Sequence, residues 1–312
     1  MKQKTKWRGI ILALTAAILW GVSGTCGQFL FMYRNINTEW LVTVRLLIAG
    51  ILLLLIAMRR HPSEVFAIWQ DKKSAAQLLV FSILGMLAVQ YTFFATIKHS
   101  NAATATVLQY SGPVMIAVYM AWHSRKWPTF LEYLAIALAV AGTFLMVTHG
   151  KTDSLSISVQ ALGWGLASAL SMAFYSIYPA QLLSRYPTPV IIGWAMVTGG
   201  TLLGFTHAPW NVSGEWDFYT LAFTAFIILL GCLVAFYAYL TAVKIIGPQT
   251  TSLLASAEPL SAAVFSLLWL KVPFTVMDWL GSLCIISTIF LLARKKQPTT
   301  AAVRAVAESP VS

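Results

Sequence analysis

The strongest constraint on this chain is its division into apolar blocks of about 20 residues, the length of one membrane-crossing helix, separated by short polar segments. Only 10% of the residues are charged and 58% are hydrophobic, whereas a soluble protein carries about 25% charged residues. So little charge does not cover the surface of a water-soluble globule. A helix also satisfies its own backbone hydrogen bonds in lipid. The sequence therefore predicts an all-α integral membrane protein.

We expect ten transmembrane helices and two segments that do not span. The segment PSEVFAIWQDKKS, residues 62–74, is too polar to cross and is predicted to lie at the interface. Residues 297–312 lack a sustained apolar face and are predicted to form a disordered cytoplasmic tail. The predicted helices cover residues 9–32, 38–58, 76–97, 102–122, 130–149, 161–183, 189–206, 217–241, 249–270 and 275–293.

The distribution of lysine and arginine predicts the orientation of the chain. With the N-terminus inside, sixteen of the 21 basic residues fall in inner segments and four in outer loops, while Arg45 lies within a helix. This bias predicts a multi-pass protein of the cell inner membrane with cytoplasmic N- and C-termini. It also accounts for the formal net charge of +11, so the lipid bilayer and not a nucleic acid is the expected partner.

An internal repeat divides the predicted helices into two groups of five. At an offset of 146 residues, the segment from Tyr91 aligns without gaps with the segment from Tyr237, with 11 identities over residues 91–147. Five is odd, so the second group enters the membrane from the opposite side. We therefore expect two inverted five-helix repeats, residues 9–149 and 160–294, an architecture common in secondary transporters.

The repeat aligns Pro113 with Pro259, each near the middle of a predicted helix. A proline inside a helix removes one backbone hydrogen bond, and lipid tolerates this where neighbours or a water-filled cavity satisfy the freed carbonyl. Interrupted helices at matching positions in two halves point to a transport site. The alternative is a plain structural kink in each helix.

Two charged residues fall inside predicted helices. Glu258 lies roughly 13 Å into its helix by helical rise, where a carboxylate is costly unless it is paired or protonated. It is predicted to bind a cationic group of a solute or to carry a coupling proton. Arg45 is predicted to hold a solute carboxylate. The alternatives are a structural ion pair between the two, or snorkelling of Arg45 to the outer interface.

Amide and aromatic residues on these helices complete the predicted site. Amides and phenols inside a bundle suit a polar organic solute, although packing or an interfacial aromatic belt explains each residue taken alone better than binding does. Gln109 and Tyr110 are the first candidates because they precede Pro113 by one turn. The three cysteines show neither metal spacing nor a disulfide framework, so no metal and no cofactor is expected. The further candidates are Trp20, Gln90, Tyr91, Tyr178 and Tyr237.

One motif suggests an enzyme instead. Gly21-Val22-Ser23-Gly24 has the G-x-S-G form of some intramembrane serine proteases. A serine nucleophile needs a base within hydrogen-bond reach, and all five histidines are predicted at helix ends or in loops. No Walker loop is present. We therefore expect no enzymatic activity.

Several stretches together resemble the EamA branch of the drug/metabolite transporter superfamily. They are Leu19-Trp20-Gly21, the VRLLIAG around Arg45, the paired NAATATVLQYSGP and GPQTTSLLASAEP, and the closing GSLCIISTIFLL. The resemblance covers about residues 9–294. It implies ten helices in two five-helix repeats, and export or exchange of amino acids or other small metabolites.

The chain departs from this family pattern at the ends of helices four and nine. Where family members often carry Leu-Gly-Glu, this sequence reads His123-Ser124-Arg125 and Leu270-Lys271-Val272, so no role tied to that glutamate is carried over. The sequence leads us to expect a secondary transporter, an exporter of small solutes working by alternating access. It leaves proton coupling, substrate identity and oligomeric state open. The alternative is a non-transporting membrane protein such as a receptor or an intramembrane enzyme.

Overall fold

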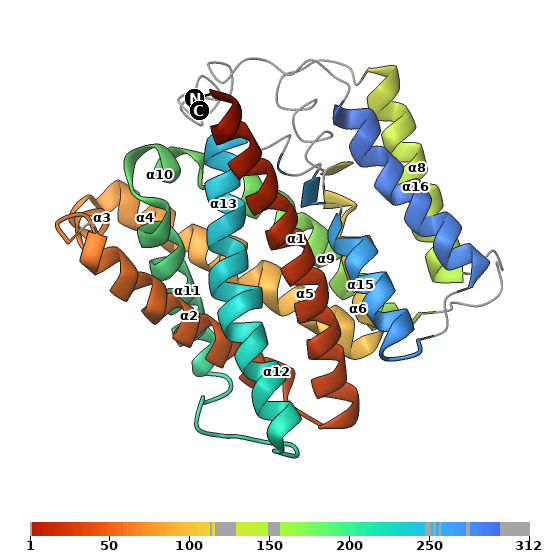
Figure 1. Cartoon of the computed structure of the whole chain (residues 1–312), viewed down its shortest axis with the longest axis horizontal. Coiled ribbons are helices and arrows are strands. Elements are labelled where there is room, and N and C mark those ends of the chain that lie inside the picture. The colour runs from red at the N-terminus through yellow and green to blue at the C-terminus, as the bar shows by residue number, and fades with distance from the viewer. Residues whose placement is uncertain are drawn as a thin grey trace.

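A computed structural model describes residues 2–60, 62–112, 114–115, 129–148, 157–246, 251, 254–255, 257–272 and 275–293. All of its regular elements over these residues are helices (Figure 1). Pro113 and the tail at residues 297–312 lie outside the described residues. In the first half of the chain the helices are α1 Lys2–Tyr33, α2 Thr38–Arg60, α3 Ala67–Gln70, α4 Lys72–Val80, η1 Phe81–Leu87, α5 Ala88–His99, α6 Ala102–Gln109 and α8 Phe130–Thr148.

The second half contains helices of similar length and composition. They are α9 Val159–Ile177, α10 Ala180–Arg185, α11 Thr188–Gly204, α12 Phe218–Ile228, η2 Leu229–Val234, α13 Ala235–Ile246, α15 Ala257–Leu268 and α16 Val276–Ala293.

Among the described residues, four helical stretches are long and apolar enough to cross a membrane, namely Lys6–Tyr33, Thr38–Arg60, Lys72–His99 and Phe218–Ile246. Other apolar helices, such as Thr188–Gly204, are shorter. The prediction of an all-helical, membrane-spanning fold is therefore confirmed at this level. Many large apolar side chains, Leu170 and Phe290 among them, point outward and are exposed, as helices in contact with lipid require.

Three predicted helices contain features that hydrophobicity did not reveal. The range 76–97 contains the π-helical segment η1, and 217–241 contains a second π-helical segment, η2. The predicted helix 161–183 is interrupted between α9 and α10 at Tyr178 and Pro179. Pro179 has no N–H to continue the helical hydrogen bonds, so the chain turns there and α10 begins after it.

The helices pack in a limited set of pairs. α1 lies along α13 and α15, α9 lies along α5 and α6, and α6 also packs against α15. Two more pairs, α2 with α11 and α8 with α16, flank this centre, and Figure 1 shows α8 and α16 side by side at one edge. In addition, α11 packs against η1 and α2 against η2. The helices at the centre are those on which the sequence placed most of its candidate residues.

Close packing of α2 on α11 depends on Gly50. A Cβ atom at Gly50 would lie 2.9 Å from the backbone nitrogen of Val197 and 2.9 Å from Cβ of Met196. Because backbone cannot yield as a flexible side chain does, we expect Gly50→Ala to destabilise the protein by about 1–3 kcal/mol, seen as a lower midpoint of thermal unfolding in detergent.

Gly163 in α9 is the matched control. Nothing lies within 4 Å of a Cβ atom built there, and alanine is the better helix former by about 1 kcal/mol. Gly163→Ala should therefore leave the midpoint unchanged or raise it. Equal midpoints for the two variants would contradict the close approach of α2 and α11.

Candidate functional site

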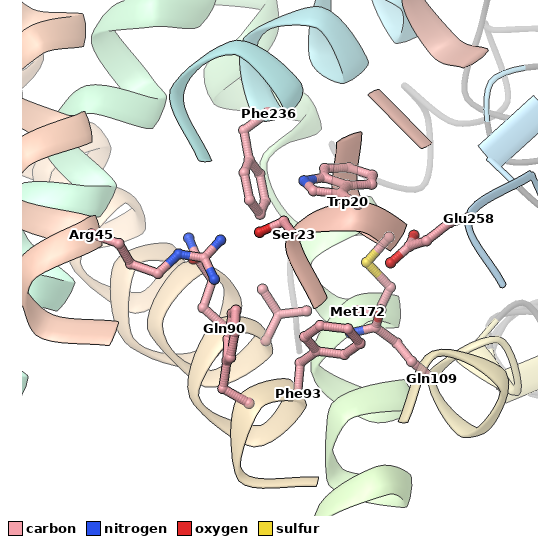
Figure 2. Close-up of a pocket in the computed structure, with 11 residues that line it drawn as sticks. Trp20, Ser23, Arg45, Gln90, Phe93, Gln109, Met172, Phe236 and Glu258 are labelled. Carbon is pink, nitrogen blue, oxygen red and sulfur yellow. The ribbon is translucent and has the colours of Figure 1, made fainter. Parts of the chain in front are cut away.

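A cavity lies at the centre of the described helices, where α1, α2, α5, α6, α9, α13 and α15 converge (Figure 2). Its volume is about 40 Å³, room for about three water molecules at 10–15 Å³ each. Both halves of the chain contribute to its walls. The lining residues are Trp20, Ser23, Arg45, Val89, Gln90, Phe93, Phe94, Gln109, Met172, Phe236 and Glu258.

Arg45 from α2 forms one end of the cavity. Its side chain is buried, with 3% of its surface exposed, so it does not snorkel to an interface. The guanidinium lies over the ring of Phe94, 4.5 Å from the centroid, and the thiol of Cys232 is beside it. Nε and Nη1 have no hydrogen-bond partner among the residues that the structure describes. A buried guanidinium with unused donors is suited to an anionic group entering the cavity.

Glu258 from α15 lies at the other end, across the cavity from Arg45 in Figure 2. Its side chain is also buried, at 3% exposure. The phenol of Tyr110 is 3.3 Å from its Oε2 and donates more closely to the backbone oxygen of Ala255. Burial of a carboxyl group beside one neutral donor leaves it able to accept a cation or a proton.

Arg45 and Glu258 do not form an ion pair in the part of the chain that the structure describes. The aromatic and polar side chains of Trp20, Ser23 and Phe93 lie between them in Figure 2. The site therefore has a basic end and an acidic end, separated by the space that a solute would occupy. The structural alternative weighed above, mutual neutralisation, does not describe this conformation.

Polar groups between the two ends have unused hydrogen-bonding capacity. Within the described part of the chain, Trp20 Nε1 and Ser23 Oγ are buried without a hydrogen-bond partner. The amide of Gln109 donates to Ser168 Oγ at 2.7 Å, and that of Gln90 contacts the sulfur of Met86 at 3.2 Å. Unpaired buried polar groups are costly, so these donors suit the polar atoms of a bound molecule or water.

The backbone of α6 is irregular next to the cavity. The helix ends at Gln109, and Tyr110 and Ser111 form a turn in which Ser111 N–H bonds to the Leu108 carbonyl at 3.1 Å. Pro259 is buried in α15, and the described residues 254–255 just before this helix are also helical. The predicted range 249–270 runs partly over residues outside those that the structure describes.

Three of the predicted residues point away from the cavity. The phenol of Tyr91 is 3.4 Å from a carboxylate oxygen of Glu39. Tyr178 stacks on Phe174 with ring centroids 4.6 Å apart. Tyr237 is partly buried against the hydrophobic core. By contrast, Trp20, Arg45, Gln90, Gln109 and Glu258 all line the cavity, and Tyr110 contacts it through Glu258.

The apolar residues that line the site were not among the candidates predicted from the sequence. Phe93 and Phe94 follow Gln90 by three and four residues, so they share its helical face. Ser23 follows Trp20 by three residues for the same reason. Ser23 was noted only within the protease-like motif. The signal that would have identified these residues is their spacing of three or four positions from Gln90 and Trp20, which places them on the same helical faces. The others that were missed are Val89, Met172 and Phe236.

The sequence matches a known protein family. The model of the EamA-like transporter family matches residues 7–148 and 160–294. The uncharacterized inner membrane transporter YicL of Salmonella typhimurium is 42% identical over 290 residues, covering 92% of this chain and 95% of its own. The uncharacterized transporter sll0355 of Synechocystis is 24% identical over 316 residues, covering 95% and 93%. A crystal structure of a protein 14% identical has a TM-score of 0.62 and covers 96% of this chain and 99% of its own. At that identity the likeness concerns the fold alone.

Proposed function

The chain belongs to the EamA-like transporter family, and we propose that it is a secondary transporter that exports amino acids or other small metabolites across the cytoplasmic membrane by alternating access. The observation that carries the proposal is the central cavity, with Arg45 at one end and Glu258 at the other. Export as the direction follows the resemblance to the drug/metabolite branch.

The packing of the helices supports two inverted five-helix repeats. Exchanging the halves at the offset of 146 residues turns the contact of α1 with α13 into that of α9 with α5. The pairs α2–α11 and α8–α16 map onto themselves. The π-helical segments η1 and η2 also fall at nearly the same offset. This pattern favours ten helices related by a two-fold axis, as proposed.

The burial of the two charged ends favours a mechanism with moving helices. Arg45 and Glu258 are each only 3% exposed, so a solute reaches both of them when the helices around the site separate. A site at the junction of two repeats is opened to either side by rocking one group of helices against the other. With both termini cytoplasmic, as proposed, α1 and α9 enter from opposite sides.

The charges at the two ends support a solute that carries both signs. A carboxylate would accept hydrogen bonds from the free Nε and Nη1 of Arg45, and an ammonium group would lie at Glu258. The aromatic wall of Trp20, Phe93 and Phe236 would pack against an apolar side chain. Glu258 would alternatively carry a coupling proton while the solute is bound by the rest of the site.

Transport by the purified full-length protein in proteoliposomes tests the proposal. We expect efflux of at least one radiolabelled amino acid from preloaded vesicles, above the leak from protein-free vesicles, with apolar side chains preferred. Unlabelled solute on the outside of the vesicles should accelerate efflux of the same labelled solute, as expected for exchange by a carrier. The absence of specific flux for the whole set of amino acids and related metabolites would favour a receptor or another non-transporting role.

A further inference from the structure

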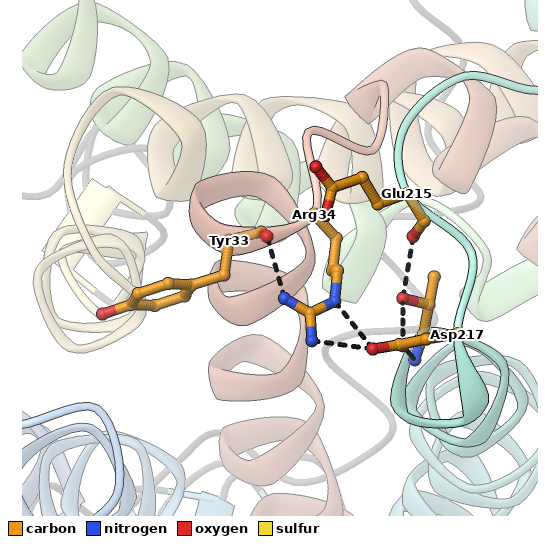
Figure 3. A network of polar contacts seen from close by, with 5 residues as sticks. Tyr33, Arg34, Glu215 and Asp217 are labelled. Atoms are coloured by element: carbon orange, nitrogen blue, oxygen red, sulfur yellow. Dashed lines mark hydrogen bonds and ion pairs between the residues drawn. The ribbon is translucent and has the colours of Figure 1, made fainter.

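An ion pair joins two loops at one end of the helix bundle (Figure 3). Arg34, just after α1, donates from Nη2 to Oδ2 of Asp217 at 2.8 Å and from Nε to the same oxygen at 3.2 Å. Asp217 is also the N-cap of α12, since Oδ1 accepts the backbone N–H of Thr220 at 2.8 Å. One carboxylate thus fixes the start of α12 and binds the end of α1.

Further contacts hold the same two loops together. The backbone N–H of Glu215 donates to the carbonyl of Arg34 at 2.9 Å. Gly214 has φ of +90°, and a Cβ atom there would overlap the carbonyl oxygen of Arg34, so this approach requires glycine. The indole of Trp40 donates to the carbonyl of Pro209 at 2.8 Å. The loops after α1 and before α12 therefore form a closed contact.

A second arginine–aspartate pair lies at the opposite end of α2. Arg34 precedes the start of α2, whereas Asp71 follows its end, about 34 Å away along 23 residues of helix. Asp71 is the N-cap of α4 and accepts hydrogen bonds from Lys73 and Ser74. Arg185, the last residue of α10, reaches it at 3.9 Å. The second pair therefore joins the end of α10 to the start of α4.

The aspartates of the two pairs are equivalent under the repeat, whereas the arginines are 151 residues apart, five positions from the offset of 146. Asp71 and Asp217 are 146 residues apart, and so are their capping partners Ser74 and Thr220. Each arginine follows the first long helix of its half. They differ in tightness, since the first pair makes two hydrogen bonds and the second makes only a 3.9 Å contact. The Arg34 side chain is 23% exposed and that of Arg185 is 54% exposed.

We propose that Arg34–Asp217 and Arg185–Asp71, built on equivalent aspartates, are latches on opposite faces of the transporter, which close in alternation during the cycle. The inference rests on the transport function proposed above. In the conformation described, the latch on the predicted outer face is closed and the one on the predicted cytoplasmic face is loosened. A symmetric pair of weak contacts suits this task because each must break once in every cycle.

Both latches stay charged at physiological pH. The side chain of Arg34, together with Thr220, lowers the pKa of Asp217 to about 2. The hydroxyl of Ser74, with backbone donors, lowers the pKa of Asp71. Neither carboxylate takes up a proton near neutral pH, so the latches respond to helix movement and not to titration.

The test measures access to the cavity from each face of the membrane. Ser23→Cys places a thiol in the cavity wall of a variant that lacks the three native cysteines. The unfolding midpoint of this cysteine-free variant must match that of the parent protein. A membrane-impermeant maleimide is applied to vesicles of known orientation, and labelling rates are compared. The substitutions are Arg34→Gln and Asp217→Asn. Asparagine is as good an N-cap as aspartate, so the second variant removes the charge and keeps the start of α12.

We expect each substitution to raise labelling from the outer face by roughly 1.4-fold to fivefold, the range for loss of an exposed ion pair. The double variant should show no further increase, because the two residues act through one contact. Asp71→Asn, the matched control, should raise labelling from the cytoplasmic face only. Additive effects of the two outer substitutions, or equal changes at both faces, would refute the latches.

Labelling needs no transported solute, so the two proposals fail separately. Opposite, face-specific changes in a protein without detectable flux would retain the latches and remove the proposed substrates. Normal flux with labelling that none of the substitutions alters would remove the latches alone.

Discussion

Glu258→Gln is expected to abolish transport driven by a pH gradient. The carboxyl group is buried at the acidic end of the cavity, and its described side-chain partner is the phenol of Tyr110. Glutamine keeps the size and the acceptor oxygen but neither ionises nor carries a proton. The loss of a charge-assisted hydrogen bond is worth about 1.5–3 kcal/mol, so binding of a cationic group should weaken roughly tenfold to hundredfold.

The same variant separates the two roles considered for Glu258. If the residue carries a proton, counterflow exchange should persist in Glu258→Gln while the response to pH disappears. If it binds the cationic group of the solute, exchange and driven transport should fall together. Asp278→Asn is the control, since Asp278 is a buried carboxyl group of α16 that does not line the cavity. An unchanged rate and pH profile in Glu258→Gln would eliminate both roles.

The course of the helices was largely predictable because lipid imposes a strict length. Thr38–Arg60 was predicted as 38–58 and Val276–Ala293 as 275–293, since polar residues mark the edges of the apolar blocks. The π-helical segments were not predictable in this way. They need one extra residue per turn, which hydrophobicity does not record. Each contains a glycine, Gly85 and Gly231, and a Cβ atom at Gly231 would overlap Ser23 of the cavity wall.

The two charged residues of the site were identified from the sequence because a charged side chain inside an apolar helix has a high free-energy cost. An arginine or a glutamate inside an apolar helix is tolerated only in the bundle interior or a cavity, and both Arg45 and Glu258 line one. The aromatic residues were chosen by chemical type and not by helical phase. Tyr237 was preferred to its neighbour Phe236, yet Phe236 faces the cavity, because adjacent residues on a helix point about 100° apart.

The two arginine–aspartate pairs could not be predicted from the sequence. Counting basic residues assigned Arg34 to the outer loops and Arg185 to the inner segments. The partners of these residues lie 183 and 114 positions away in the sequence. A single sequence gives no indication that such distant residues meet. Only the packing of α1 against α12, and of α10 against α4, brings each arginine to its aspartate.

Arg45→Met is expected to remove transport while leaving the protein at least as stable as the parent. Methionine fills a similar length with apolar atoms and leaves no buried charge. Nε and Nη1 of Arg45 have no hydrogen-bond partner among the described residues, so hydrogen bonds do not offset the cost of burying them in the empty site. Replacing such a group by an apolar residue is often neutral or stabilising by about 1–4 kcal/mol. Flux of a solute with a carboxylate should fall roughly tenfold to hundredfold, from the loss of charge-assisted hydrogen bonds.

Arg45→Lys completes the argument, because lysine keeps the charge without the planar donor pair. Its transport rate should lie between those of the parent and Arg45→Met, and the Michaelis constant should rise more for solutes with a carboxylate than for those without one. Thermal unfolding in detergent checks the stability of both variants. A structural arginine would give the reverse pattern, a lower unfolding midpoint in Arg45→Met with normal flux per folded molecule. The exchange Arg45→Glu with Glu258→Arg should not restore transport, since the two residues face a solute and not each other.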